Sequence, residues 1–326
     1  MRKSLMLVAL FVLVAAAGCT GPRIKLFPSQ TDPLQEFTLE GKASEKILLL
    51  PVRGVISDSP ERGLLRTQPS TVQEVVSHLR KAEKDALVKA VVLQLNSPGG
   101  SVTASDVLYN EISRFKERTG RPVVAMMMDV AASGAYYIAL PADVIVAHPT
   151  TLTGSVGVIF IRPKVAGLME KIGVGVEVSK SGLNKDSGSP FRATTPEEAL
   201  IFQEMTDRLA KRFVDLVRKH RGPDGAALSA VSSARVYLAE EALALKLVDR
   251  IGYMQDAVAQ ARERAGLPED AKLVVYRRTE YPDDNVYNPS TSYEGGRPVA
   301  LFDTGLAQLL PALPSGFYYL WHPAGD

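Results

Sequence analysis

Short apolar runs alternate with helix-like stretches along the first half of the chain. The runs at 45–56, 89–95, 121–128 and 142–147 have the composition of buried strands. Between the first two, residues 71–88 repeat apolar positions with helical spacing, since Val72, Val75, Val76 and Leu79 fall on one face. Residues 105–120 repeat the helical pattern. This alternation predicts βαβ units and an α/β fold, with a largely parallel sheet covered by helices.

The second half contains a longer helical pattern at 196–220. Thr194 or Thr195 can cap its start, Pro196 suits its first turn, and basic residues gather at its end. Two shorter helical patterns follow at 234–252 and 254–266.

The flanking segments divide the chain into four parts. The first is a signal peptide at 1–18, followed by a tether at 19–44 that is rich in proline and polar residues. A single domain spans 45–268, and an irregular extension rich in aromatic residues spans 269–326.

The N-terminus indicates export. Arg2 and Lys3 precede an apolar run at 5–17, which is short for a membrane span and typical of a signal peptide. Cys19 follows Ala-Ala-Gly and resembles the lipidated cysteine of a bacterial lipobox, although Ala16 stands where such signals usually carry leucine. An uncleaved anchor or a plain signal peptide remains the alternative. We expect an exported, membrane-anchored protein of a bacterial cell envelope.

Composition excludes several functions. The 326 residues include 38 basic and 36 acidic ones, a near balance that argues against a nucleic-acid partner. Cys19 is the single cysteine, so no disulfide can form within the chain. The sequence contains no P-loop pattern and no zinc-ligand spacing, so neither ATP, a metal nor another cofactor is expected.

Two small-residue motifs are candidates for chemistry. The glycine pair in NSPGGS (96–101) ends a strand, where its amides are able to meet an anion or simply form a tight turn. Ser133 also follows a strand, with the amide of Gly134 beside it as an oxyanion donor. A buried, unpaired hydroxyl is costly, which favours a nucleophile, while tight helix packing by a small residue is the alternative.

A serine nucleophile needs a base, and the histidines are poorly placed to supply it. His78 is expected on the exposed side of a charged helix, His220 lies in a solvated cluster, and His322 is near the end of the chain. His148 is nearest to the motifs but is more typical of a strand end.

Lysine is the other candidate base. Lys180 and Lys185 lie in a loop rich in glycine and serine at 179–190. A lysine with its ordinary pKa of about 10.4 is protonated near neutrality. Lowering a lysine pKa by about 3 units, worth roughly 4 kcal/mol, requires apolar burial or a nearby cation.

Taken together, the three motifs resemble one family. NSPGGS (96–101), the segment 129–158 and KSGLNKDSGSPFR (180–192) follow the order and separation found in the signal peptide peptidase (protease IV) family of serine peptidases. The resemblance covers roughly residues 45–265. It implies the Clp protease/crotonase-like fold with a single catalytic domain.

The resemblance also implies roles for individual residues. Ser133 is the expected nucleophile and Lys185 the general base of a Ser-Lys dyad. Gly100 and Gly134 supply the oxyanion-hole amides. Ser155 either orients the lysine amine or is a turn residue that supports the neighbouring glycines.

The family likeness further implies hydrophobic peptide substrates such as remnant signal peptides, and a homo-oligomeric ring in which a dyad can be completed across a subunit interface. The 269–326 extension has no counterpart in the family that the motifs resemble. It covers the domain, contacts lipid headgroups or occludes the groove, and we favour the first.

Two other functions stay open. A catalytically silent lipoprotein scaffold would keep the fold, although the intact serine, lysine and glycines disfavour it. A crotonase-type acyl-CoA enzyme is disfavoured by export and by the lack of a carboxylate in the Ser133 motif.

Overall fold

The computed structural model describes residues 32–62, 67–223, 225–288 and 316–321. The predicted signal peptide and Cys19 lie outside this part of the chain. The strands are β1 (Gln35–Glu40), β2 (Lys46–Arg53), β3 (Glu61–Arg62), β4 (Thr67–Gln68), β5 (Val88–Ser97), β6 (Gly99–Ser101), β7 (Val123–Ala132), β8 (Val144–Ala147), β9 (Leu152–Gly154), β10 (Ile159–Ile161), β11 (Val236–Leu238), β12 (Arg250–Ile251), β13 (Lys272–Arg277) and β14 (Gly316–Leu320). The helices are α2 (Thr71–Lys84), α3 (Val102–Thr119), α4 (Gly134–Ala139), α5 (Ala166–Lys171), α6 (Pro196–Arg221), α7 (Gly225–Ser232), α8 (Ala239–Ala244) and α9 (Met254–Arg264).

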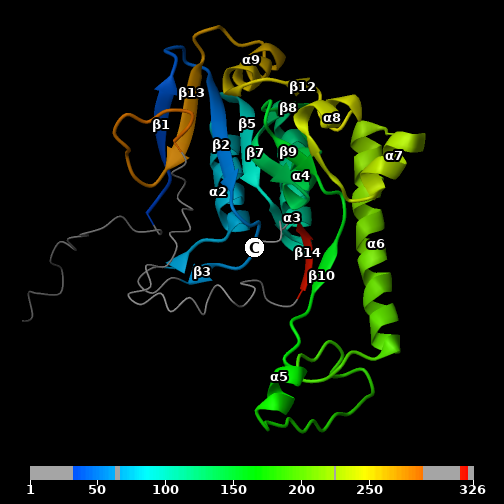
Figure 1. Ribbon diagram of the computed structural model, residues 1–326. Helices are drawn as coiled ribbons and strands as arrows, with labels where there is room; N and C mark the ends of the chain where they lie inside the picture. The colour runs from blue at the N-terminus through cyan, green and yellow to red at the C-terminus, as the bar shows by residue number, and fades with distance from the viewer. Residues whose placement is uncertain (1–31, 63–66, 224, 289–315, 322–326) are drawn as a thin grey trace, which may run out of the picture.

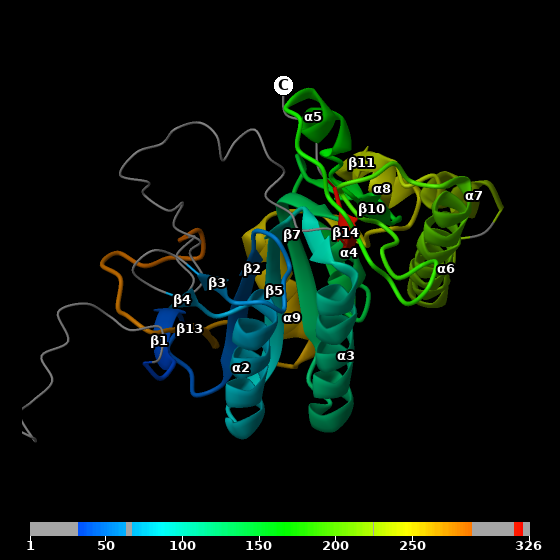
Figure 2. The ribbon, with the colours of Figure 1, turned by 90° about the horizontal axis from the view of Figure 1, so that it is seen from below.

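A twisted sheet forms the centre of the molecule (Figures 1 and 2). Its strands follow the order β1-β13-β2-β5-β7-β8-β12, and β9 joins the end of β7 and pairs with β11. The pairs β2–β5, β5–β7, β7–β8 and β8–β12 are all parallel. The structure therefore confirms the predicted α/β fold with a largely parallel sheet.

Helices cover both faces of this sheet because its strands are apolar on both sides. In β2, Leu48, Leu50 and Val52 belong to one core cluster, while Ile47 and Leu49 belong to the other. The first cluster also contains buried residues of α2 and α3, namely Val75, Leu79, Leu108 and Ile112. The second contains residues of α9, namely Met254, Ala257 and Val258.

The sheet extends beyond the expected 45–268 domain on both sides. β1 lies in the segment expected to be a tether, and it pairs antiparallel with β13. β13 lies beyond residue 268 and pairs parallel with β2. Its Leu273, Val274 and Val275 are buried. β1 and β13 pair with each other although they lie about 235 residues apart in the sequence. Local periodicity cannot reveal such a pairing.

Helix ends follow the predicted signals. Thr195 caps α6: its side chain accepts a hydrogen bond from the Glu198 amide at 3.2 Å, and the Glu198 carboxylate accepts one from the Thr195 amide at 3.0 Å. Pro196 is the first residue of the helix, as predicted. Gly222 ends it with a φ of 60°.

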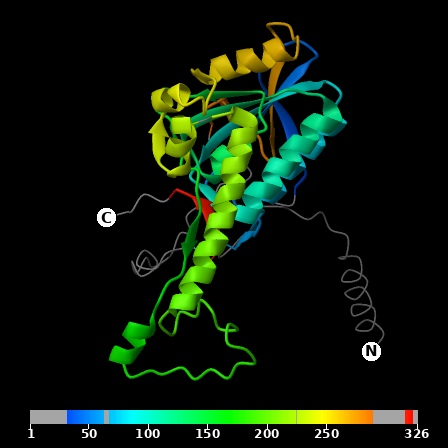
Figure 3. The same cartoon turned by 90° about the vertical axis from the view of Figure 1, so that its right-hand side faces the viewer.

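An arm of residues 162–195, which includes α5, extends away from the body (Figures 1 and 3). From the end of the arm, α6 returns over its 26 residues, a length of about 39 Å. Every residue from 171 to 185 is exposed. Among the residues that the structure describes, no helix is both long and apolar enough to cross a membrane.

Candidate active site

Ser133 stands at the sharp turn between β7 and α4. Its amide donates to the Gly154 carbonyl at 2.8 Å, and its own carbonyl accepts from the Tyr137 amide at 2.9 Å. These bonds fix the serine between the last residue of β9 and the first turn of α4. The sheet thus holds the backbone of Ser133 at the end of a central strand, where parallel sheets commonly place functional residues.

The conformation of Ser133 is strained. Its φ of 53° and ψ of −115° lie outside the regions that residues with a Cβ atom normally adopt. The residue is only 1% exposed, and its Oγ atom is buried without a hydrogen-bond partner. Both features cost free energy, and such strain tends to gather at functional sites. They favour a nucleophile over a residue chosen for packing.

The predicted oxyanion glycines come together beside Ser133. A Cβ atom built on Gly134 would lie 3.1 Å from the amide nitrogen of Gly100. Gly99, the other member of the glycine pair, has a φ of 101°, and a Cβ atom there would lie 2.7 Å from the Gly134 nitrogen. Only residues without side chains allow this approach. Two backbone amides therefore converge near the serine, as an oxyanion hole requires.

Gly100 is also held against a second segment. The backbone of Gly100 packs directly against the backbone of Ile56. A Cβ atom on Gly100 would lie 1.9 Å from the Ile56 carbonyl oxygen, so only glycine fits at this position. The Ile56 amide donates to the Gly99 carbonyl at 2.8 Å, and the Ser101 amide donates to the Ile56 carbonyl at 2.9 Å. These bonds hold the glycine strand rigidly.

Ser155 lies next to the Ser133 turn. Ala132 pairs with Gly154 between β7 and β9, so each serine follows one member of that pair. Ser155 is 8% exposed, has a φ of 52°, and its amide donates to the Arg235 carbonyl at 2.9 Å. Its position is compatible with either interpretation, orienting a lysine or supporting the turn.

Lys185 is not brought to Ser133 within one chain. Lys185 is exposed and belongs to the arm, which extends away from the body (Figure 3), whereas Ser133 is buried. The backbone beside it is well held, because Asp186 accepts hydrogen bonds from the Arg192 Nε at 2.9 Å and the Lys180 Nζ at 2.7 Å. These two cations, Arg192 first, hold the pKa of the Asp186 carboxyl well below its usual range.

The same arginine ties this loop to α6. Arg192 NH1 donates to the Glu198 carboxylate at 2.9 Å. This bond, aided by the Thr195 amide, holds the pKa of Glu198 at about 2. Lys180, the other lysine of the loop, forms an ion pair with Asp186.

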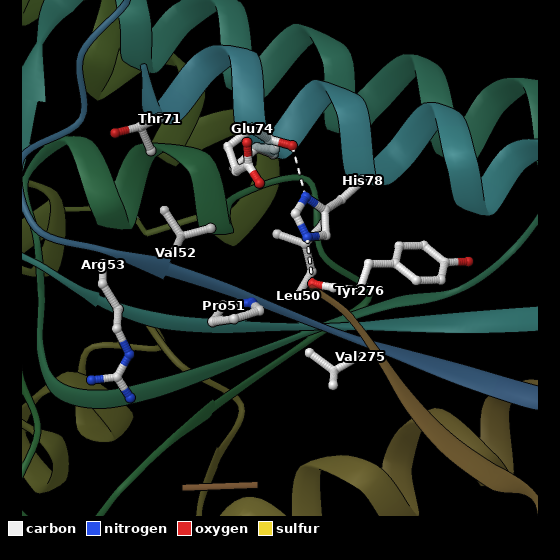
Figure 4. Close-up of a pocket in the computed structure, with 10 residues that line it drawn as sticks. Leu50, Pro51, Val52, Arg53, Thr71, Glu74, His78, Val275 and Tyr276 are labelled. Carbon is white, nitrogen blue, oxygen red and sulfur yellow. Dashed lines mark hydrogen bonds between the residues drawn. The ribbon is translucent and has the colours of Figure 1, made fainter. Parts of the chain in front are cut away.

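The histidines do not form a triad. His148 Nδ1 bonds the Thr150 hydroxyl at 2.9 Å, at the end of β8 as expected. His78 was expected on an exposed face, and this was wrong: it is 5% exposed. Its ring bonds the Glu74 carbonyl at 2.8 Å and the Tyr276 carbonyl at 3.0 Å (Figure 4). The unexpected strand β13 supplies the second carbonyl and covers this helix face.

His78 lines a small cavity between α2 and the sheet (Figure 4). Its volume of about 10 Å³ is at most enough for one water molecule. This cavity is a packing feature and not a substrate site. Within the described ranges, no group of three or more histidine, cysteine or acidic side chains could hold a metal ion.

Comparison with known proteins agrees with this geometry. The model of peptidase family S49 matches residues 115–268, and that of the Clp protease family matches residues 66–150. A putative signal peptide peptidase SppA of Enterococcus faecium is 35% identical over 78% of this chain and 73% of its own length. Protease 4 of Salmonella typhi is 40% identical over 59% of this chain and 31% of its own length.

This chain therefore belongs to peptidase family S49, the signal peptide peptidases. It is a serine peptidase with a Clp protease-like α/β fold, as predicted from the motifs.

One part of the site escaped the sequence analysis. β14, from the expected extension, pairs with β6 and with β10. The alternation in GFYYL is uninformative because nearly every residue is apolar, so neither a strand nor its partners could be predicted.

Proposed function

We propose that this protein is a membrane-associated endopeptidase that cleaves hydrophobic peptides, such as remnant signal peptides, with a Ser-Lys dyad. Ser133 is the nucleophile, and Lys185 of a neighbouring copy is the base. The amides of Gly100 and Gly134 form the oxyanion hole. The observation that carries this proposal is the strained, buried and unpaired hydroxyl of Ser133 beside two converging glycine amides.

Assembly supplies the base that one chain lacks near its serine. Lys185 is exposed and belongs to the arm, and the loop that carries it is held by the ion pair between Asp186 and Arg192. Such an arm is suited to reach the active site of the next copy in a ring. Heterologous contacts of this kind close into rings when the rotation permits.

The exposed apolar side chains of the arm support a second copy as its partner. Leu168, Ile172, Val176 and Leu183 are 50–71% exposed. Clustered apolar groups of this kind mark contact surfaces. Covering them by a second copy would also dehydrate the lysine, and burial favours the uncharged amine that a general base needs.

The proposed chemistry is ordinary acyl transfer. The uncharged amine of Lys185 takes the proton of Ser133 Oγ as that oxygen attacks the peptide carbonyl carbon. The oxyanion is stabilised by the amides of Gly100 and Gly134. The ammonium then returns the proton to the leaving amine, and water hydrolyses the acyl-enzyme by the reverse route. Ser155 orients the lysine amine.

Attachment is assigned to the N-terminus. Cleavage before Cys19 and its lipidation would hold the chain at a bacterial membrane, where hydrophobic peptide remnants accumulate. Mass spectrometry of the mature N-terminal peptide distinguishes a lipidated Cys19 from a plain signal peptide or an uncleaved anchor.

The sharpest test is complementation between two inactive variants. Ser133→Ala and Lys185→Ala should each lower hydrolysis of a hydrophobic fluorogenic peptide by at least about a thousandfold. When the two are co-expressed in equal amounts, about one quarter of the sites in a ring combine an intact serine with an intact lysine from the next copy. Activity should therefore return to about a quarter of the wild-type value.

Lys171→Ala is the matched control, since Lys171 is another exposed lysine of the arm. It should keep most of the activity. No recovery in the mixed rings would exclude a dyad formed between copies. Full activity of Lys185→Ala would return Lys180 or His148 as the base. A folded, assembled wild type that cleaves nothing would favour the silent scaffold.

A further inference from the structure

A second pocket lies at the C-terminal end of α6, away from the arm (Figure 1). Its volume is about 410 Å³, which is within the range of small-molecule sites. None of its lining residues belongs to the candidate active site. They come from the last turn of α6, from α8 and from the segment after α8, namely His220, Arg221, Leu243, Lys246, Val248 and Asp249.

Arg221 holds the two sides of this pocket together. Its Nη2 and Nη1 atoms donate to the two carboxylate oxygens of Asp249 at 2.8 and 3.1 Å, and its Nε atom donates to the Lys246 carbonyl at 2.8 Å. Asp249 also accepts from the Ile145 amide at 2.7 Å, so both of its oxygens are engaged. A guanidinium has five N–H groups, and these bonds use three of them. Two N–H groups of Arg221 are therefore left to meet a ligand.

Lys246 adds a positive charge to the same pocket. In the part of the chain that the structure describes, no carboxylate forms an ion pair with it. Its φ is 58°, and it directly follows Leu245, the C-cap of α8. Glycine is the usual residue at such a position, because a residue with a Cβ atom is strained there. A lysine that is kept at a strained position favours a role for its side chain.

The surroundings of His220 show the same excess of positive charge. Burial lowers the pKa of His220, and Lys219, Lys116 and Arg221 lower it further. Its ring is therefore uncharged near neutral pH, and its Nε2 atom bonds the Tyr109 hydroxyl at 2.8 Å. The C-terminal dipole of α6 contributes only about half of a negative charge, which is less than one ammonium group supplies. The pocket keeps a net positive charge.

We propose that this pocket binds an organic phosphate, with the phosphate group beside Lys246 and Arg221 and the carbon skeleton against Leu243. An ammonium and a guanidinium together suit a phosphate ester, which carries between one and two negative charges and several acceptor oxygens. Leu243 is 39% exposed and supplies an apolar wall. Small phosphate esters and phospholipid headgroups share this chemistry. The site is separate from the proposed peptidase function and does not depend on it.

The test is isothermal titration calorimetry on the full-length chain, purified in detergent as its assembled form. Glycerol 3-phosphate should bind saturably, and more tightly than inorganic phosphate, which lacks a carbon skeleton, or glycerate, which carries a carboxylate instead. Lys246→Gln should weaken binding by about tenfold or more, because one charged hydrogen-bonding group is lost. Lys84→Gln is the matched control, since Lys84 is an exposed lysine at the end of another helix, α2. It should bind as wild type does.

Lys246→Gly separates binding from folding. Glycine adopts the φ of 58° without strain, so Tm should rise while the affinity for glycerol 3-phosphate falls as in Lys246→Gln. Peptide hydrolysis measured without phosphate esters should be the same in both variants as in wild type. A Lys246→Gly chain that binds glycerol 3-phosphate as tightly as wild type would overturn the proposal.

The source of the phosphate is found by competition. If a lipid headgroup enters the pocket, detergent micelles that contain phosphatidylglycerol should weaken the binding of glycerol 3-phosphate to wild type. Unchanged binding in these micelles would assign the pocket to soluble phosphate esters. The proposal fails if neither probe binds saturably, if glycerate binds as tightly as glycerol 3-phosphate, or if Lys246→Gln leaves the affinity unchanged.

Discussion

Replacing Ser133 by alanine should abolish activity and at the same time stabilise the fold. The Ser133 Oγ atom is buried and has no hydrogen-bond partner. A buried hydroxyl in this state costs about 1–3 kcal/mol relative to an apolar group. Alanine removes the hydroxyl without enlarging the side chain, so the free energy of unfolding should rise by about that amount.

Replacing Ser133 by glycine should raise the free energy of unfolding further, because it also removes the backbone strain. The φ of 53° and ψ of −115° cost a residue with a Cβ atom about 1–3 kcal/mol, while glycine pays about 0.5–1 kcal/mol in backbone entropy. Ser133→Gly should therefore be more stable than Ser133→Ala by roughly 1 kcal/mol. Each kcal/mol corresponds to about 2–4 °C in Tm for a domain of this size.

The assay is thermal unfolding at one protein concentration and detergent composition. All chains carry Lys185→Ala, so that every variant is compared in the same inactive background. Ser105→Ala is the control, because its equally buried Oγ atom donates to the Ser101 carbonyl at 3.0 Å. That variant should lose about 0.5–1.5 kcal/mol. A Ser133→Ala chain as unstable as Ser105→Ala would refute the reasoning.

Four further predictions concern the oxyanion strand and the arm. Gly100→Ala should abolish peptide hydrolysis and lower Tm, because its Cβ atom would lie 1.9 Å from the backbone oxygen of Ile56. Arg192→Gln should reduce kcat while circular dichroism of the body stays unchanged, since Arg192 fixes the loop that carries the base. The pKa of the Glu198 carboxyl in this ion pair is depressed to about 2, so the stabilisation is complete above the ordinary carboxyl pKa and is lost as the pH falls toward about 2. In wild type, the protection factors of the loop amides, which correct for the intrinsic pH dependence of exchange, should fall only in that window. Val176→Glu should dissociate the assembly in light scattering and remove activity together with it, because a charge is placed on an exposed apolar arm.

The central sheet and its helices were predictable because their signals are local. Buried parallel strands are continuous apolar runs, and the helices between them repeat at 3.6 residues. The Thr195 cap and Pro196 start α6 as predicted because capping depends on neighbours within one turn. The candidate site motifs were equally visible, since the Ser133 turn and the glycine pair each need small residues at fixed positions.

Tertiary structure alone decided which distant segments meet. β1 and β13 pair across most of the chain and extend the sheet past its expected limits, and the same strand buries His78. The arm separates Lys185 from Ser133 although both motifs were recognised. β14 lies on Gly100 because an exposed strand edge accepts any extended segment with a suitable register, and register is a property of two strands together. The sequence by itself determined which residues are candidates for the chemistry, and long-range pairing determined which distant segments lie beside them.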